Sequence, residues 1–166
     1  MHRYFMVCML LLGSSYSGLV SANDDGFSGR FTVHEDGVVL DTLTGLTWQR
    51  CSLGARWQAE QGCLGEPELM TLAEAKFAAA QSGDGWRVPS IEELYSLVAP
   101  EQVNPAINAT VFPDIIDSSE GAPYWSVTPI AELPPLTYYV DFMSGRVDGH
   151  SDGFALSVRQ IGRAHV

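Results

Sequence analysis

The chain has 166 residues, of which 46% are hydrophobic and 17% charged, and its formal net charge at pH 7 is −11. This length and balance suit one globular domain with a buried core. A chain this acidic does not follow a nucleic-acid backbone by counterion release, and anionic lipid repels it. We therefore exclude nucleic acid as a partner; a basic protein, a neutral glycan or a cation remains compatible with the charge.

Residues 1–22 have the layout of an export signal, with a short basic start, an apolar run over residues 4–12 and a small-residue cleavage site ending at Ala22. The apolar run is too short to span a bilayer, and no later segment is apolar enough, so no stable membrane insertion is expected. Cys8 lies in this run without a lipobox, which argues against a lipid anchor. We expect export to the periplasm or the outside of a bacterial cell, with an uncleaved anchor as the alternative.

The exported chain keeps two cysteines, Cys51 and Cys63. An oxidising compartment and an even cysteine count predict one disulfide, which closes a short loop and stabilises the fold by about 3 kcal/mol. The alternative is a two-cysteine metal site, for which His34 is the only imidazole nearby in the sequence. We expect the disulfide, and no metal or other cofactor.

The first half of the exported chain alternates short strand patterns with turns. Strands are expected at residues 30–34, 38–41 and 46–50. Asp36-Gly37 favours a hairpin between the first two. Residues 52–69 show no clear period and several glycines, so we expect a loop held by the disulfide.

Two helices follow, over residues 71–81 and 91–98, and each begins with a capping box. The boxes are Thr71 with Glu74 and Ser90 with Glu93.

The second half begins with a long irregular loop, residues 100–123, whose apolar side chains are expected to pin it to the core. Further strands are expected at residues 124–128, 137–142, 146–147 and 155–160. Strands, two helices, a long loop and again strands indicate an α+β domain with helices beside an antiparallel sheet.

Several short motifs, in this order and spacing, resemble one bacterial family. They are Asp36-Gly37-Val38-Val39-Leu40-Asp41, Thr44-Gly45-Leu46-Thr47-Trp48-Gln49, Trp86-Arg87-Val88-Pro89-Ser90 with Glu93-Leu94, Phe112-Pro113, Tyr124-Trp125-Ser126, Val140-Asp141-Phe142 with Gly145, and Val158-Arg159. The family is DUF1566, the Legionella collagen-like protein C-terminal domain, and the resemblance spans residues 30–159.

The resemblance implies a C-type-lectin-like fold, in which two helices flank a small twisted antiparallel sheet and the first and last strands pair. It also implies an exported or surface domain without general enzymatic activity; some members are implicated in binding sulfated glycans. We expect the domain to cover residues 23–160. The family often ends in a different motif, and residues 161–166 back-translate to a common sequencing-library adapter, so we expect this tail to be an artefact.

The residues offer little catalytic chemistry. Calcium-dependent sugar capture of the C-type-lectin kind needs loop and strand triplets that this chain lacks. His34 and His150 are the only histidines between the signal and the tail, and no nucleophile elbow is present. A resemblance of Trp86–Pro89 to formylglycine-generating enzymes fails because both cysteines lie early. A pair of loop carboxylates for glycoside hydrolysis remains open, because such pairs are set in space.

Candidate binding residues lie in the loops. Asp148, His150 and Asp152 alternate, which is compatible with a cation site or with a solvated hairpin end. Trp57 is the best candidate for an exposed aromatic residue that stacks on a sugar or a partner. The alternative is that Trp57 packs locally over the disulfide.

Three other tryptophans, Trp48, Trp86 and Trp125, are expected in the core. Arg87 is expected to be a structural cation.

We therefore predict a non-enzymatic recognition module that binds a glycan or a surface protein. The expected contacts come from the loops between residues 100 and 152, with Trp57, Asp141, Asp148, His150 and Asp152 as ligand-binding residues. The alternatives are a secreted carbohydrate hydrolase and a structural subunit of a surface assembly.

Overall fold

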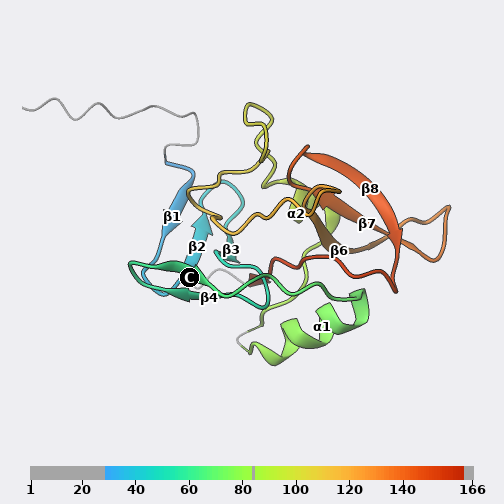
Figure 1. Ribbon diagram of the computed structural model, residues 1–166, viewed down its shortest axis with the longest axis horizontal. Coiled ribbons are helices and arrows are strands. Elements are labelled where there is room, and N and C mark those ends of the chain that lie inside the picture. Colours follow the sequence, from blue (N-terminus) through green and yellow to red (C-terminus); the bar gives the residue numbers. More distant parts are fainter. Residues whose placement is uncertain (1–28, 84, 163–166) are drawn as a thin grey trace, which may run out of the picture.

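The computed structural model describes residues 29–83 and 85–162, which form two helices and three small antiparallel sheets (Figure 1). This confirms the α+β class. The expected signal, residues 1–22, and residues 163–166 lie outside the described residues. None of the described helices has the length and apolar composition needed to cross a membrane.

The first sheet has the order β1-β2-β3-β9, with β1 at Phe31–Val33, β2 at Val38–Asp41, β3 at Leu46–Gln49 and β9 at Ile161–Gly162. Val39 lies opposite Trp48, and both side chains are fully buried. The implied pairing of first and last strands is wrong for the described strands, because β9 pairs with β3 while β1 pairs only with β2.

The position of β9 follows from the residues just before it. Arg159 donates to the backbone carbonyls of Gln49, the last residue of β3, and of Arg50, which follows it. This fixes the last segment along β3, on the opposite edge of the sheet from β1. The strand begins one residue after the expected domain boundary at Gln160, and its Ile161 is fully buried.

The second sheet is formed by β6 (Pro123–Pro129), β7 (Leu136–Asp141) and β8 (Arg146–Ser151). The strand β8 is longer than predicted, so Asp148 and His150 lie on a paired strand rather than in a hairpin end. The prediction of a strand over residues 155–160 is wrong. That segment makes only isolated bridges, one of them from Leu156 to Met70.

The loop expected over residues 52–69 contains a small hairpin of β4 (Arg56–Gln58) and β5 (Gly62–Leu64). Its strands have three residues each, too few to show a period in the sequence. The predicted disulfide is confirmed: it joins Cys51 to Cys63 and so ties this hairpin to the end of β3.

The helices are α1 (Leu72–Gln81) and α2 (Ile91–Tyr95), and both predicted capping boxes are confirmed. The second helix ends three residues earlier than expected. Leu97 and Val98 donate to carbonyls only three residues back, which tightens and ends the helix. Arg30 donates to the Ser96 carbonyl and caps that end.

Two apolar clusters form the core. The first joins the four-stranded sheet and α2 to the long loop, and the second lies between α1 and β6. Trp48 and Trp125 are fully buried as predicted. Trp86 is only partly buried, because it covers the outer strand β9 at Gly162. Arg87 is the predicted structural cation and pairs with Glu93 through two short contacts of 2.7 and 2.6 Å.

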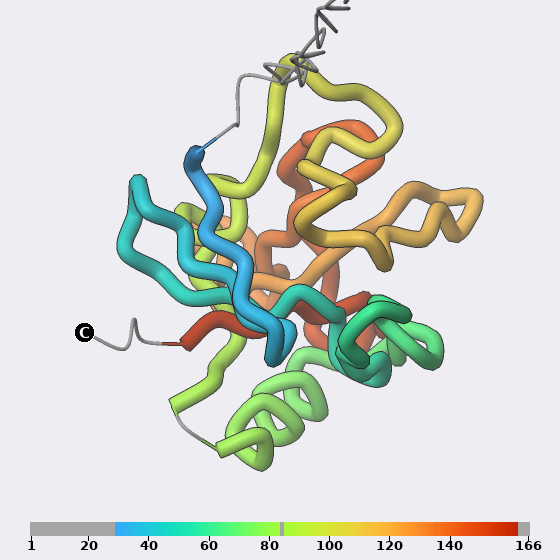
Figure 2. Tube along the Cα trace, turned by 90° about the vertical axis from the view of Figure 1, so that its left-hand side faces the viewer, coloured from blue at the N-terminus to red at the C-terminus, as the bar shows by residue number. Residues whose placement is uncertain are grey.

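The long loop lies at the top of the view in Figure 2, and its Asn104 and Ala106 amides donate to the backbone carbonyls of the turn between β7 and β8. Its pinning is confirmed for Ile107, Val111 and Phe112, which are buried. Ile116, however, is 53% exposed, and the chain around it forms one wall of the candidate site.

Candidate functional site

Three segments that are distant in the sequence enclose a groove of about 530 Å³. The segments are residues 66–69 before α1, residues 116–123 leading into the start of β6, and residues 154–157 before β9. This volume lies in the range of sites that hold small ligands or single side chains. The lining residues are Glu66, Pro67, Leu69, Ile116, Ser118, Glu120, Ala122, Pro123, Phe154, Ala155, Leu156 and Ser157.

Three large apolar side chains of this groove are exposed to solvent. Leu69 is 57% exposed, Ile116 53% and Phe154 45%, and each comes from a different wall. Single exposed apolar residues are ordinary, but a gathering of them in a concave surface marks a binding site. The groove therefore offers apolar surface for a ligand to cover.

The floor of the groove is held by backbone hydrogen bonds between its walls. Met70 and Leu156 exchange two, at 2.9 and 3.0 Å, and the Ser157 amide donates to Pro123 at 3.1 Å. On the third wall, the Ser118 amide and hydroxyl both donate to the Gly121 carbonyl. The groove is thus formed before any ligand arrives, which reduces the entropy lost on binding.

A second, more polar depression of about 370 Å³ adjoins the groove and shares Glu120 with it. Its lining residues are Glu120, Gly121, Tyr139, Asp141, Ser144, Arg146 and Asp148. Two of the predicted ligand-binding residues, Asp141 and Asp148, therefore lie in one site. They come from β7 and β8, which are hydrogen-bonded neighbours.

Asp141 shapes this depression. Burial raises the pKa of its carboxyl, but hydrogen bonds from the Ser144 hydroxyl and from backbone amides, including Ala122 and Met143, outweigh burial and lower the pKa overall. Gly121 has φ of +95°, and a Cβ atom there would lie 2.6 Å from an Asp141 oxygen. This close approach requires glycine.

Tyr139 is the aromatic residue of the depression. Partial burial raises the pKa of its hydroxyl, and the negative charges of Asp148 and Asp141 raise it further. Its hydroxyl therefore stays protonated and available as a donor, beside the carboxylate of Asp148 as an acceptor.

His150 and Asp152 lie apart from this pair. The His150 ring stacks on Phe154 with centroids 3.8 Å apart, at the edge of the groove. The Asp152 carboxylate accepts a hydrogen bond of 2.6 Å from the Thr137 hydroxyl. Its backbone carbonyl accepts from the Leu72 amide at the start of α1.

The alternating acids do not form a metal-ligand group. Within the described residues, the one group of three close potential ligand atoms is Cys51, Cys63 and Asp114. Its two sulfur atoms form the disulfide, so they are not thiolates.

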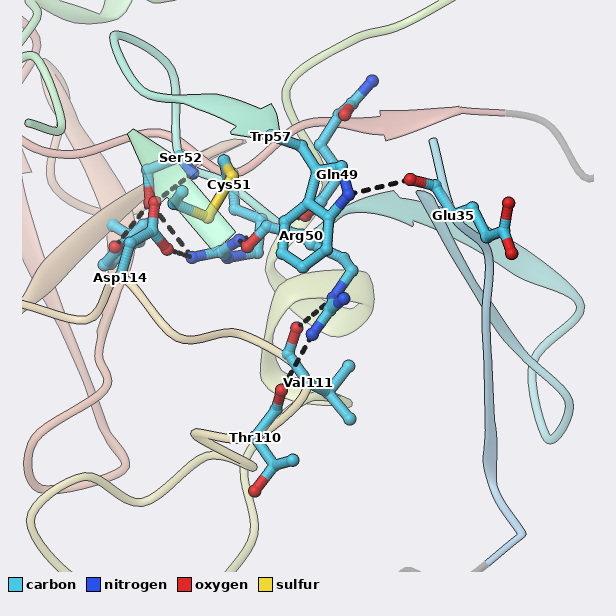
Figure 3. The surroundings of a disulfide bond; sticks show 12 residues. Glu35, Gln49, Arg50, Cys51, Ser52, Trp57, Thr110, Val111 and Asp114 are labelled. Carbon is cyan, nitrogen blue, oxygen red and sulfur yellow. Dashed lines mark hydrogen bonds and ion pairs between the residues drawn. A yellow bond between two sulfur atoms is a disulfide. The ribbon is translucent and has the colours of Figure 1, made fainter. Parts of the chain in front are cut away.

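Trp57 lies outside the groove, beside the disulfide (Figure 3). Its indole nitrogen donates to the Glu35 carbonyl at 2.9 Å, and the Arg50 guanidinium carbon lies 3.9 Å from the ring centroid. Arg50 in turn donates to the carbonyls of Thr110 and Val111. One face of the indole is therefore covered, and the contacts match local packing over the disulfide.

Sequence reasoning missed a buried polar network behind the disulfide. Arg159 is fully buried and pairs with Asp114 at 2.7 Å. The same guanidinium nitrogen donates a hydrogen bond of 3.0 Å to the Ser52 hydroxyl. Asp114 also accepts from the Ser52 amide at 2.6 Å, and Tyr124 completes the network at 2.8 Å from Ser52. The available signal was the place of Arg159 and Tyr124 in the family motifs.

These features define a disulfide-bonded α+β domain with a preformed groove on its loop side. Residues 37–161 match the model of the Lcl C-terminal domain, and the chain belongs to this family, as the motifs predicted. A comparison with curated proteins finds no match. Family membership alone specifies neither a ligand nor a reaction.

Proposed function

We propose that this protein is an exported, non-enzymatic recognition module that binds a glycan or a surface protein through the groove and the adjoining depression. The observation that carries the proposal is the preformed groove with three exposed apolar side chains, Leu69, Ile116 and Phe154. A domain of this size gains nothing in stability from such exposure, so a ligand that covers these side chains explains it.

Export is supported by the disulfide, because such bonds persist in the periplasm and outside the cell. We place the domain in the periplasm or on the outer surface of a bacterium. A C-type-lectin-like architecture is the fold that we propose for it, given two helices beside small twisted sheets and a long loop that carries binding surface.

A carbohydrate hydrolase is the second candidate, because three carboxylates, Glu120, Asp141 and Asp148, line one depression. A glycosidase needs one acid kept protonated by an apolar environment. Glu120 and Asp148 are exposed, and Asp141 already accepts hydrogen bonds that favour its ionised form. The site therefore supports binding better than hydrolysis. A structural subunit of a surface assembly would instead show as self-association in light scattering.

Screening the full exported chain on glycan and protein arrays tests the recognition function. We expect binding that falls about tenfold or more in Phe154→Ser, because a central apolar contact contributes most of its energy in a desolvated site. Leu43→Ser is the matched control, since Leu43 is 77% exposed and outside the groove. Arrays without a hit, or equal losses in both variants, would count against the function.

A further inference from the structure

The groove has a charge character as well as an apolar one. Glu66 and Glu120 are exposed and lie on different walls, and the lining contains no lysine, arginine or histidine. The whole chain carries a net charge of −11. An anionic ligand, including a sulfated glycan, would be repelled from this position, whereas a cationic one is attracted.

We infer that the groove binds a segment of a partner protein in which an aliphatic or aromatic side chain is flanked by lysine or arginine. The inference rests on the proposed recognition function and names the partner's chemistry. The apolar side chain packs among Leu69, Ile116 and Phe154, and the flanking cations meet Glu66 and Glu120.

The lining favours a peptide over a sugar. Most of it is aliphatic or proline, and Phe154 is its one aromatic residue. The His150 ring already stacks on Phe154, at an interplanar angle of 23°. A sugar needs an open aromatic face and several directional polar groups, while an apolar side chain needs only area to cover.

The polar depression extends the same recognition. Glu120 belongs to both sites, so a segment that crosses it carries its next residue toward Asp148 and Tyr139. Arg146 also lines the depression, and its positive charge repels a second cation of the ligand close to it. The strongest requirement is therefore one apolar residue with cations beside Glu66 and Glu120.

Selection from a random peptide library displayed on phage, with the full exported chain as target, tests this directly. We expect enriched sequences to place Leu, Ile, Val, Phe or Tyr next to Lys or Arg. The most enriched peptide is then synthesised with its cations intact, and again with each replaced by Ser or Glu. Its affinity should fall at least tenfold with Glu, and it should weaken with added salt.

Groove variants and controls connect the peptide to the site. We expect Glu66→Gln with Glu120→Gln, and separately Phe154→Ser, to weaken binding of the synthetic peptide about tenfold. Glu132→Gln removes an exposed acid between β6 and β7 that lines neither site, and it should leave binding unchanged. Thermal unfolding of each variant confirms that these exposed changes leave the fold intact.

Enrichment of acidic or uncharged sequences, binding that survives the double glutamine variant, or no enrichment at all would overturn the inference. A glycan hit on the arrays that Phe154→Ser abolishes, together with an empty peptide selection, would keep the recognition function and reject the cationic peptide. Failure of both screens would reject both.

Discussion

The buried network and the open depression use the same four residue types, arginine, aspartate, tyrosine and serine. The closed set is Ser52, Asp114, Tyr124 and Arg159, and the open set is Tyr139, Ser144, Arg146 and Asp148. In the closed set the side chains contact one another, and Arg159 donates two hydrogen bonds within the set and two to the backbone carbonyls of Gln49 and Arg50. In the open set Ser144, Arg146 and Asp148 are exposed to solvent.

The contrast shows that burial, rather than residue type, separates a structural site from a binding site. Burial raises the cost of any unpaired charge, so the buried charge of Arg159 needs its counterion Asp114 within the protein. In the open set, water molecules hydrogen-bond to the polar groups until a ligand replaces them. The free-energy cost of displacing this water is small enough for reversible binding. Substitutions in the two sets should therefore differ sharply in their effects on stability.

The largest effect is expected for Asp114→Asn, which leaves the charge of Arg159 buried without its counterion. We expect the free energy of unfolding to fall by about 3–5 kcal/mol. Denaturant unfolding at neutral pH measures the loss. Asp117→Asn, an exposed acid in the same loop, is the control and should stay within about 0.5 kcal/mol of the parent. A loss below about 1 kcal/mol for Asp114→Asn would mean that burial does not govern this pair.

The disulfide gives the next effect, because it holds the segment that begins the closed network. Cys51 directly precedes Ser52, and the bridge closes a loop with a sequence separation of 12. We expect Cys63→Ala to lower the free energy of unfolding by about 3 kcal/mol through the unfolded state. A reducing agent should lower the melting temperature of the parent and leave that of the variant unchanged. Equal sensitivity of both proteins would contradict the bridge.

Local signals carried most of the fold prediction. The capping boxes at Thr71 and Ser90 need only residues three positions apart, and each was found where predicted. The hairpin β4–β5 was missed because strands of three residues show no period. The pairing of β9 with β3 depends on hydrogen bonds from Arg159 to the carbonyls of Gln49 and Arg50, which lie more than a hundred positions away. No short pattern records a contact of that separation.

The candidate site was predictable only in part, for the same reason. The sequence named Asp141 and Asp148 as candidate binding residues, but it did not predict that they line one depression, because their register follows from the full length of β8. The other two walls of the groove meet through the bridge between Met70 and Leu156. Leu69 and Phe154 border that bridge, and the sequence pattern marked neither as exposed.

An intermediate effect is expected for Asp41→Asn, since this buried carboxylate pairs with the partly covered Arg30 at 2.6 Å. We expect a loss of about 2 kcal/mol at pH 7, as for hydrogen bonds to charged groups. Burial raises the pKa of Asp41, but hydrogen bonds from Arg30 and Thr44 and the charge of Arg30 lower it overall.

Because the folded pKa of Asp41 lies below its unfolded value, the stabilisation is complete above the ordinary carboxyl pKa. It is lost as the pH falls through the lower, folded value. The difference in unfolding free energy between the parent and Asp41→Asn should therefore shrink on acidification, as denaturant unfolding at a series of pH values measures. A difference that stays constant or grows would contradict this pairing.

The smallest stability effect is expected for Asp148→Asn in the open depression. Asp148 is exposed, and its carboxylate accepts a hydrogen bond from the neighbouring Gly149 amide. We expect a change in unfolding free energy below about 0.5 kcal/mol. Binding of the selected cationic peptide should weaken roughly two- to fivefold, which matches one solvent-exposed ion pair.

Comparing Asp148→Asn with Asp114→Asn therefore separates the two sets by their effects on stability and on binding. Asp114→Asn should unfold the protein more easily, with binding lost only as the folded fraction falls, whereas Asp148→Asn should weaken binding in a protein of parental stability. Denaturant unfolding and peptide titration on the same preparations give both readings. If Asp148→Asn destabilised the fold as much as Asp114→Asn, the depression would be a second structural network, and the groove would have to account for recognition alone.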